Sequence, residues 1–303
     1  MSRHAYMIMA HRDFGQLLRL VKFLDSSETD IYLHVDRKAA EFDSARIRSA
    51  CRQSRLILMP RKRLAWGGAS LTECEIAMLR KALPERYDYY HLLSGNDIPL
   101  RPLEEIHRHF DARAGEEFVA VNWDATSKPG IYGRIRQYYL FQDLTGRRGT
   151  GLNALLWELQ LILVNMQKKL GIDRCRNFQL RLGKGSQWFS VTHAFAEHLV
   201  QLYDSELRRS FAFSKGSDEL LVQTAILNGT EFLQHLSSDG NMRLIDWSRS
   251  VDGCSPHTFT AEDYEMMMTS GKLWARKVSE ETDSVIIDRI YKTVGSTERT
   301  EEV

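Results

Sequence analysis

Two short segments of this chain contain the side chains best suited to chemistry, and we expect them to form the two halves of one site. Residues 184–189 read KGSQWF and residues 215–219 read KGSDE, and the functional interpretation depends on Glu219. Ser217 is a good helix N-cap, so the sequence predicts that Asp218 and Glu219 lie in the first turn of a helix, where the helix dipole favours a charged carboxylate. An ionised carboxylate beside a hydroxyl group can act as a general base. The alternative is that the acidic pair only complements the end of a helix.

The composition of the 303 residues narrows the class of partner. Lys and Arg (41) nearly balance Asp and Glu (40), and the aromatic residues are not interleaved with a basic stripe, so we expect no nucleic-acid partner. The four cysteines are far apart and show no Cys or His spacing suited to zinc. These features indicate an ordinary globular protein without a structural metal.

The N-terminus predicts a cytoplasmic location. A strand-like run from His4 to Ala10 begins almost at once, without the charged region, long apolar region and small-residue cleavage site of a signal peptide. No apolar run reaches the roughly 18 residues of a membrane-spanning helix.

Alternating strand and helix patterns predict a parallel sheet with crossover helices. Residues 6–10, 30–36 and 55–59 are short apolar runs, and apolar residues at helical spacing follow Asp13, a candidate helix cap. Ligands of such sheets bind beyond the carboxyl ends of the strands. The polar residues expected at that edge are His11, Arg12, Asp36, Arg37 and Lys38. Alternatively, they only face solvent.

A glycine pair follows the third strand. Trp66 precedes Gly67 and Gly68, which permit close backbone approach to a ligand, and Ser70 with Glu73 predicts a capping box for the next helix. The alternative is a tight turn with a buried tryptophan.

The strand and helix alternation breaks between residues 127 and 181. Residues 152–170 (LNALLWELQLILVNMQKKL) predict a helix with apolar side chains on more than one face. One interpretation is a helix packed across the domain. The other is a peripheral membrane contact, in which the apolar face enters the interface and nearby cations meet anionic lipid. Those cations are Arg147, Arg148, Lys168, Lys169, Arg174 and Arg176.

Eight motifs in series resemble the core-2/I-branching β-1,6-N-acetylglucosaminyltransferase and peptide O-xylosyltransferase family, from about His4 to Tyr291. In chain order they are HVDRK (34–38), LAWGGASL (64–71), LLSGNDIPLR (92–101), KGSQWF, KGSDE, IDW (245–247), GCSPHTF (253–259) and LWARK (273–277). The WGGAS, GCSP and ARK elements are more similar to the xylosyltransferase branch.

The resemblance implies an α/β fold of the GT-A (Rossmann-like) nucleotide-sugar type, with a central, mostly parallel sheet and an inserted helical segment. We expect one domain over residues 1–295: a nucleotide-sugar half (1–126), a variable helical insertion (127–181) and an acceptor and catalytic half (182–295). A polar tail (296–303) follows. The resemblance also implies inversion at the anomeric carbon without a divalent metal, and the sequence contains no Asp-x-Asp pair.

Matching to the family motifs assigns roles to single residues. Glu219 is the expected general base, and Arg276 and Lys277 are expected to stabilise the UDP leaving group in place of a metal. Expected donor contacts are Ala10, His11, Asp36, Lys38, Trp66, Gly67, Asp97 and His257. The branching enzymes have an arginine that helps to bind the diphosphate, and His257 lies near the corresponding position of this sequence. Expected sugar or acceptor contacts are Ser186, Gln187, Trp188 and Asp218.

The sequence thus predicts a UDP-sugar-dependent glycosyltransferase that uses UDP-xylose or UDP-N-acetylglucosamine. The expected acceptor is a glycan, glycolipid or peptide hydroxyl, and no cofactor is needed. Because a membrane anchor is missing, we expect a bacterial-type cytoplasmic enzyme, unlike the Golgi members of the family. One alternative is a non-catalytic sugar-binding protein on the same fold. A dinucleotide-dependent oxidoreductase is a weaker alternative, since the first turn after a strand lacks G-x-G-x-x-G.

Overall fold

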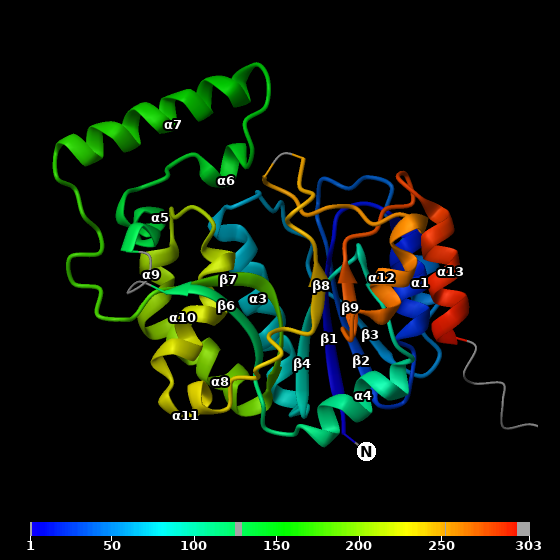
Figure 1. Cartoon of the computed structure of the whole chain (residues 1–303). Coiled ribbons are helices and arrows are strands. Elements are labelled where there is room, and N and C mark those ends of the chain that lie inside the picture. Colours follow the sequence, from blue (N-terminus) through cyan, green and yellow to red (C-terminus); the bar gives the residue numbers. More distant parts are fainter. Residues whose placement is uncertain (1, 125–128, 252, 296–303) are drawn as a thin grey trace, which may run out of the picture. The chain divides into compact units, whose positions relative to one another are not determined.

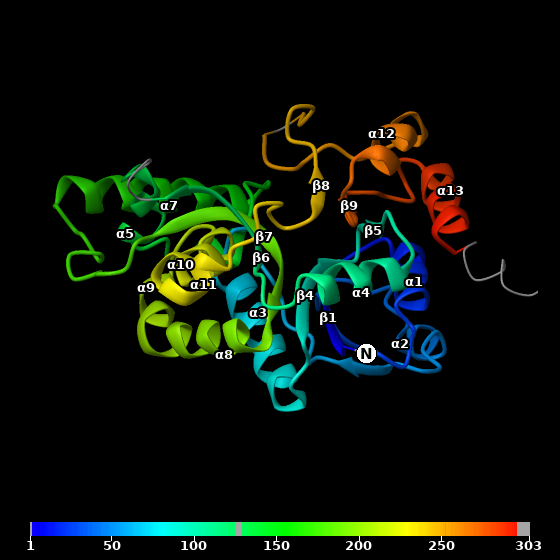
Figure 2. The same ribbon diagram turned by 60° about the horizontal axis from the view of Figure 1, so that its bottom comes forward.

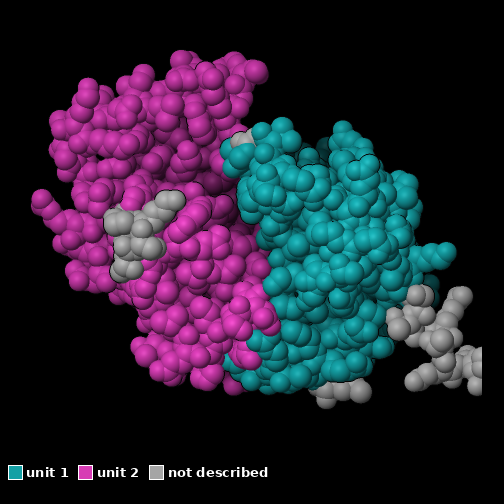
Figure 3. Space-filling view, in the orientation of Figure 1, with its two compact units in different colours: residues 1–61, 87–115, 242–303 teal, residues 62–86, 116–241 magenta. Residues whose placement is uncertain are grey.

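The computed structural model describes residues 2–124, 129–251 and 253–295. Its residues group into two compact units, each built from segments far apart in the sequence (Figure 3). Unit 1 comprises residues 1–61, 87–115 and 242–303, and unit 2 comprises residues 62–86 and 116–241. The expected polar tail, residues 296–303, lies outside the described residues. The expected division into two halves and an insertion stays a prediction.

Unit 1 contains four parallel strands in the order β3-β2-β1-β4 (Figures 1 and 2). The strands are β1 (His4–Ala10), β2 (Thr29–Val35), β3 (Arg55–Leu58) and β4 (Tyr89–Ser94). β1 and β2 are buried along their whole length, as expected of parallel strands that are covered on both faces. The predicted α/β class with a mostly parallel sheet is confirmed.

A second, three-stranded sheet of unit 1 has the order β5-β9-β8. β9 (Trp274–Arg276) runs antiparallel to β5 (Asp97–Pro99) and parallel to β8 (Arg243–Ile245). The helices of unit 1 are α1 (Phe14–Phe23), α2 (Ser44–Arg48), α4 (Leu103–Ala112), α12 (Tyr264–Thr269) and α13 (Ser284–Gly295), with a 3₁₀ turn, η5 (Ala261–Asp263), before α12. α1 and α13 lie side by side in both ribbon views. Leu273 and Trp274, which precede Arg276, are buried.

Unit 2 contains one antiparallel strand pair, β6 (Phe118–Asp124) and β7 (Gly183–Thr192), covered by helices. The helices are α3 (Ala69–Ala82), α5 (Gly133–Arg136), α6 (Gln142–Thr145), α7 (Leu152–Lys169), α8 (His193–Leu202), α9 (Arg208–Phe211), α10 (Leu221–Asn228) and α11 (Thr230–Gln234). Short turns are η1 (Leu83–Glu85), η2 (Pro129–Tyr132), the π-helical η3 (Tyr203–Leu207) and η4 (Ser217–Glu219).

Two predicted helix caps are wrong. α3 begins at Ala69 with Gly68 as the N-cap residue, so Ser70 lies inside the helix instead of capping it. The backbone N–H of Ser70 donates to Asp143 Oδ1 at 3.0 Å, and that distant carboxylate supplies the cap. Asp13 precedes α1 as predicted, but its carboxylate accepts hydrogen bonds from Asn96 and from Ser279 at 3.2 Å and caps nothing.

The predicted helix over residues 152–170 is confirmed as α7. No helix among the described residues has the length and hydropathy needed to cross a bilayer.

Candidate active site

The KGSDE segment forms a turn of its own. Gly216, in a left-handed conformation, is the N-cap residue of η4, and α10 begins only at Leu221. The predicted N-cap role of Ser217 is therefore wrong, because its hydroxyl pairs with Thr72 Oγ1 at 2.8 Å. Asp218 and Glu219 lie in a 3₁₀ turn before the helix and not in its first turn.

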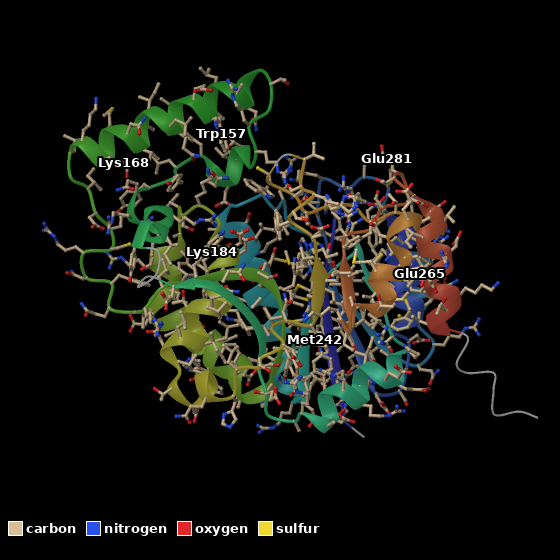
Figure 4. All side chains as sticks on the ribbon, viewed as in Figure 1. Trp157, Lys168, Lys184, Met242, Glu265 and Glu281 are labelled. Carbon is tan, nitrogen blue, oxygen red and sulfur yellow. The ribbon has the colours of Figure 1, made fainter. Side chains whose placement is uncertain are left out.

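Two cations contact the carboxylate of Glu219. Nη1 of Arg134 donates to Oε2 of Glu219 at 2.8 Å, and Nζ of Lys184 lies 3.3 Å from the same oxygen. All three side chains are only partly exposed, with Lys184 the most buried at 18%. Lys184 lies on β7 (Figure 4), and its ion pair with Glu219 brings KGSQWF and KGSDE together in unit 2, as the sequence predicts. Because both contacts use Oε2, they orient the carboxylate through one of its two oxygens.

Aromatic side chains flank these charges in unit 2. Nζ of Lys184 lies 4.7 Å from the ring centre of Trp123, which is 39% exposed. Trp66 is 41% exposed and lies under the guanidinium of Arg147, so the alternative of a buried tryptophan in a tight turn is wrong. The carbonyl of Gly67 accepts from the backbone N–H of Gly216 at 2.6 Å, which brings the glycine pair against the KGSDE turn. Exposed indoles beside a carboxylate can stack on sugar rings.

A buried carboxyl pair lies next to Glu219. Asp218 is almost fully buried, its Oδ1 has no hydrogen-bond partner among the described residues, and burial together with the charge of Glu219 raises its pKa to about 7. Burial and the charge of Asp218 raise the pKa of Glu75 well above its usual range. Nε2 of Gln187 donates to Oε1 of Glu75 at 2.6 Å. Asp218 and Gln187 thus both interact with the buried carboxyl group of Glu75, and their expected acceptor contacts stay predictions.

The other predicted acceptor residues follow along β7. The carbonyl of Ser186 accepts from Nε2 of Gln223 at 2.6 Å, and the same amide donates to Ala120 on β6 at 3.1 Å. Trp188 is only 8% exposed, and its carbonyl accepts from Asn241. Its expected stacking on a sugar stays a prediction.

In unit 1, Arg276 pairs with a buried carboxylate. Nη1 of Arg276 donates to Oδ1 of Asp97 at 3.0 Å, and the backbone N–H of Ser94 donates to Oδ2 at 3.0 Å. Asp97 and Arg276 are directly opposed in the β5-β9 ladder. Asp97 is fully buried and Arg276 is 20% exposed, so Arg276 does not lie on a solvated face. Asp97 orients Arg276, and its expected direct contact with the donor stays a prediction.

Positive charge gathers around this pair. Arg243 is buried and donates to the carbonyl of Leu92 at 3.0 Å, and burial lowers its pKa to about 10. Partial burial and the charges of Arg12 and Arg276 lower the pKa of His11. A cationic setting favours an anionic ligand such as a phosphate.

Two predicted donor residues stand at the carboxyl ends of β1 and β2. The backbone N–H of Asp36 donates to the carbonyl of Ala10 at 2.9 Å, and Asp36 Oδ1 accepts from the backbone N–H of Lys38 at 2.8 Å. Nζ of Lys38 lies 3.4 Å from Asp36 Oδ2. The structure thus brings Ala10, Asp36 and Lys38 together at the predicted sheet edge.

A cavity of about 270 Å³ between β2, β3 and α2 is lined by Leu33, Val35, Phe42, Ser44, Leu58, Met59 and Arg61.

His257 has a partner within unit 1. Its Nε2 lies 3.1 Å from Oδ2 of Asp263, whose Oδ1 accepts from Arg249 at 2.7 Å. A role of His257 toward a diphosphate stays a prediction, as does the role of Lys277, whose carbonyl accepts from Phe259.

Among residues 2–124, 129–251 and 253–295, no group of three His, Cys, Asp or Glu side chains is arranged to hold a metal ion. The expectation of a metal-free reaction stays a prediction. Glu219 belongs to unit 2, whereas Arg276 and Lys277 belong to unit 1. That they act on one substrate is likewise a prediction.

The family model for the Core-2/I-branching enzyme matches residues 4–268, which is most of the chain. The chain belongs to the Core-2/I-branching enzyme family. The family expected from the sequence motifs is therefore confirmed.

Several curated relatives of this Core-2/I-branching family member are xylosyltransferases. The chain is 23% identical over 323 residues to "Xylosyltransferase 2" of Rattus norvegicus, covering 94% of this chain and 33% of the relative. It is 22% identical over 314 residues to "Xylosyltransferase" of Ciona intestinalis, covering 97% of this chain and 34% of the relative. The chain thus spans about a third of the length of these relatives. They are animal proteins and do not test the expected bacterial origin.

A solved structure, mouse xyloside xylosyltransferase 1 in its apo form, aligns with 82% of this chain and 90% of its own length at a TM-score of 0.35 and 11% identity.

Reasoning from the sequence missed Arg134 and Trp123 as site residues and gave Lys184 no role. Arg134 lies outside the eight family motifs, 85 residues before Glu219. A lone arginine in a variable segment has no spacing signal that could connect it to a distant carboxylate. Trp123 could have been suspected, since it lies near the end of a strand that precedes the segment where the strand and helix alternation breaks.

Proposed function

We propose that this Core-2/I-branching family member is an inverting glycosyltransferase that transfers a sugar, with xylose the first candidate and N-acetylglucosamine the second, from a UDP donor to a hydroxyl group. The acceptor is a glycan, glycolipid or peptide. Glu219 is the general base, and Arg276 and Lys277 stabilise the departing UDP without a divalent metal.

The proposed reaction is a single displacement. A carboxylate oxygen of Glu219 accepts the proton of the acceptor hydroxyl, and the acceptor oxygen bonds to the anomeric carbon. The bond from that carbon to the β-phosphate oxygen breaks at the same time, and its electron pair leaves with UDP. Because attack and departure occur on opposite faces, an α-linked donor gives a β-glycoside. Positive charge near the β-phosphate stabilises the charge that develops there.

One observation supports this assignment above others: the carboxylate of Glu219 is fixed by Arg134 and Lys184 through a single oxygen. A general base must be held in one orientation and must keep an oxygen for the incoming proton. Within the described part of the chain, Oε1 of Glu219 makes no hydrogen bond, so we assign the proton transfer to that atom. If Asp218 and Glu219 only complemented the end of a helix, Glu219 would not need its contacts with Arg134 and Lys184.

In unit 1, the ion pair of Asp97 and Arg276 supports the proposed stabilisation of the departing UDP. Asp97 orients Arg276 through a 3.0 Å contact while leaving part of the guanidinium exposed. A guanidinium held in this way can donate to phosphate oxygens with little reorganisation.

The names of the relatives favour xylose as the donor sugar. The test is UDP release from UDP-xylose, UDP-N-acetylglucosamine, UDP-glucose and UDP-glucuronate, each with and without EDTA. We expect the fastest release with UDP-xylose and equal rates in EDTA. Loss of release in EDTA would contradict the metal-free mechanism, and release from none of the donors would favour a sugar-binding protein without catalysis.

A further inference from the structure

Helix α7 presents its apolar side chains outward. Six large apolar residues of α7 and its C-terminal boundary, which we call the apolar stripe, are between 39% and 71% exposed. They are Leu152, Leu155, Leu159, Ile162, Met166 and Leu170. At 3.6 residues per turn they fall within about 80° of one another around the helix axis. A surface helix of a globular protein normally turns such a stripe toward the core.

The opposite side of α7 is attached to unit 2 by polar side chains spaced seven residues apart. Gln160 accepts from the backbone N–H of Phe141 at 2.9 Å. Gln167 accepts from the backbone N–H of Tyr138 at 2.7 Å and donates to the carbonyl of the same residue at 2.9 Å. Asn153 donates to the carbonyl of Thr145 at 2.9 Å.

These contacts fix which side of the helix faces outward. Gln160 and Gln167 are buried, so α7 cannot rotate its apolar stripe inward without leaving these amides and the loop backbone unsatisfied. Trp157 also lies on the attached side, where Nζ of Lys215 approaches its ring at 5.3 Å (Figure 4). Val164 is buried together with these amides, so α7 packs against unit 2, as the first interpretation predicts, while its apolar stripe faces outward. The outward face consists of leucine, isoleucine and methionine, without Trp157.

The segment around α7 is basic. Residues 133–181 contain nine Lys and Arg against three Asp and Glu, a net charge of +6 in a chain of net charge +1. Four of the nine cations have carboxylate partners: Arg148 pairs with Glu158, Arg136 with Asp173, Arg134 with Glu219 and Arg181 with Asp124. Lys168 and Lys169 are exposed at the C-terminal end of α7, and Arg147 is exposed before its start.

We propose that the apolar stripe of α7 docks unit 2 onto an anionic lipid surface. The stripe enters the boundary between head groups and acyl chains with the helix axis along the membrane plane, while Arg147, Lys168 and Lys169 meet the lipid phosphates. The charge of the segment argues against a second copy of this chain as the occupant, because a two-fold contact would place the same +6 segment opposite itself. The proposal does not depend on the reaction assigned to Glu219.

Co-sedimentation with vesicles tests the proposal. The full chain is mixed with vesicles of phosphatidylcholine alone or of phosphatidylcholine with phosphatidylglycerol. We expect at least about tenfold stronger partitioning onto the anionic vesicles, weakened by added salt. The variant Leu155→Gln/Ile162→Gln should lose the binding, and Lys168→Gln/Lys169→Gln should lose most of the anionic preference.

A matched control replaces exposed apolar residues of unit 1. Met266→Gln/Val285→Gln removes side chains that are 40% and 62% exposed on α12 and α13, and it should bind vesicles like the wild type. Thermal unfolding of each variant verifies the fold, and the lysine pair tests the proposal even if the stripe variant does not fold. Sedimentation velocity of the wild type and the stripe variant without lipid tests for a second copy.

Three results would overturn the proposal. The first is the absence of wild-type binding to anionic vesicles. In that case an acidic protein partner would be the better explanation of the exposed stripe. The second is equal vesicle binding by the stripe variant and the control. The third is a wild-type dimer that the stripe variant dissociates without any vesicle binding.

Discussion

Nη1 of Arg134 lies 2.8 Å from Oε2 of Glu219, although 85 residues separate the two in the chain. The arginine comes from the short helix α5, which lies outside the eight family motifs, whereas the glutamate comes from one of those motifs. Arg134 also accepts through its carbonyl from the backbone N–H of Lys215 at 2.9 Å, so side chain and backbone both attach α5 to the KGSDE turn. A segment outside the family motifs thus positions the candidate general base.

Replacement of Arg134 should reduce turnover more than donor binding. Arg134→Ala removes the contact that orients Glu219, and a misplacement of about 1 Å can cost roughly 100-fold in rate. We expect kcat to fall about 10- to 100-fold with little change in the KM for the UDP-sugar, and Arg134→Lys to recover part of the loss. Steady-state kinetics with Arg148→Ala as the control checks this, because Arg148 is an exposed arginine of the same unit that pairs with Glu158. Equal kinetics for Arg134→Ala and the control would show that Arg134 does not position the base.

A methyl group at Gly216 should displace Arg134. Gly216 has a φ of +69°, and a Cβ there would collide with Nη1 of Arg134. Gly240 has a φ of +68°, and a Cβ at that position would meet nothing within 4 Å, so Gly240→Ala introduces the same backbone strain without the collision. Both variants should lose about 1 kcal/mol of unfolding free energy.

Only Gly216→Ala should also lose turnover, about tenfold or more, because the guanidinium of Arg134 must then leave Glu219. Chemical denaturation together with UDP release separates the two effects. Similar turnover of the two alanine variants would contradict the claim that a Cβ at Gly216 displaces Arg134 from Glu219.

The sequence predicts the fold better than the attachments between its elements. Buried runs such as residues 6–10 and 30–36 identify strands because apolar burial follows local periodicity. The capping of α3 by Asp143 could not be predicted, since the carboxylate lies 73 residues away from Ser70 and a local capping box offered a simpler explanation. Side-chain partners of this kind depend on how the chain folds back on itself.

The orientation of α7 shows the same limit. Its sequence has apolar residues on several faces, so hydropathy does not select the buried side. The buried side is determined by the hydrogen bonds of Gln160 and Gln167 to loop backbone. The positions of these backbone donors cannot be inferred from the pattern of side chains. At the candidate site, the motifs predicted that KGSQWF and KGSDE meet, but not that Lys184 and Arg134 both contact Glu219.

Asp218 should make unit 2 less stable as the pH rises from about 4 to about 7. Its pKa is raised from 3.8 to about 7 in the folded protein, so over this interval the folded state keeps a proton that the unfolded state has lost. The unfolding free energy therefore falls with rising pH, by up to about 1.4 kcal/mol per pH unit. Asp218→Asn removes this dependence.

Urea denaturation at pH 4.5, 6 and 7.5 measures the effect for the wild type, Asp218→Asn and the control Asp204→Asn, an exposed residue of the same unit. The difference between Asp218→Asn and the wild type should grow in favour of the variant with rising pH. A difference that stays constant with pH would contradict the raised pKa.

A buried histidine cluster should destabilise unit 1 in acid. Nδ1 of His4 lies 2.9 Å from Nε2 of His91, and the ring of His107 stacks on His4 at 3.9 Å. Burial lowers the pKa of all three rings, and neighbouring positive charge adds to the effect at His4 and His91. Below a pH of about 6.5 the unfolded rings take up protons that the folded rings do not, so stability is lost as the pH falls.

The variant His91→Gln should weaken this acid dependence by up to about 1.4 kcal/mol per pH unit, whatever its stability at neutral pH. Unfolding free energies between pH 7.5 and 5 provide the measurement, with His235→Gln as an exposed control. A slope for His91→Gln identical to that of the wild type would show that His91 does not titrate differently on folding.

The most direct test of the account is the turnover of Glu219→Gln, measured as UDP release with donor and acceptor present, beside the affinity for the UDP-sugar measured by calorimetry. The amide keeps the size of the side chain but cannot take the acceptor proton, so turnover should fall by about 10² to 10⁴ while donor affinity changes little. Glu197→Gln, on α8 of the same unit and 47% exposed, should behave like the wild type. Wild-type turnover of Glu219→Gln would contradict the assignment of Glu219 as the general base.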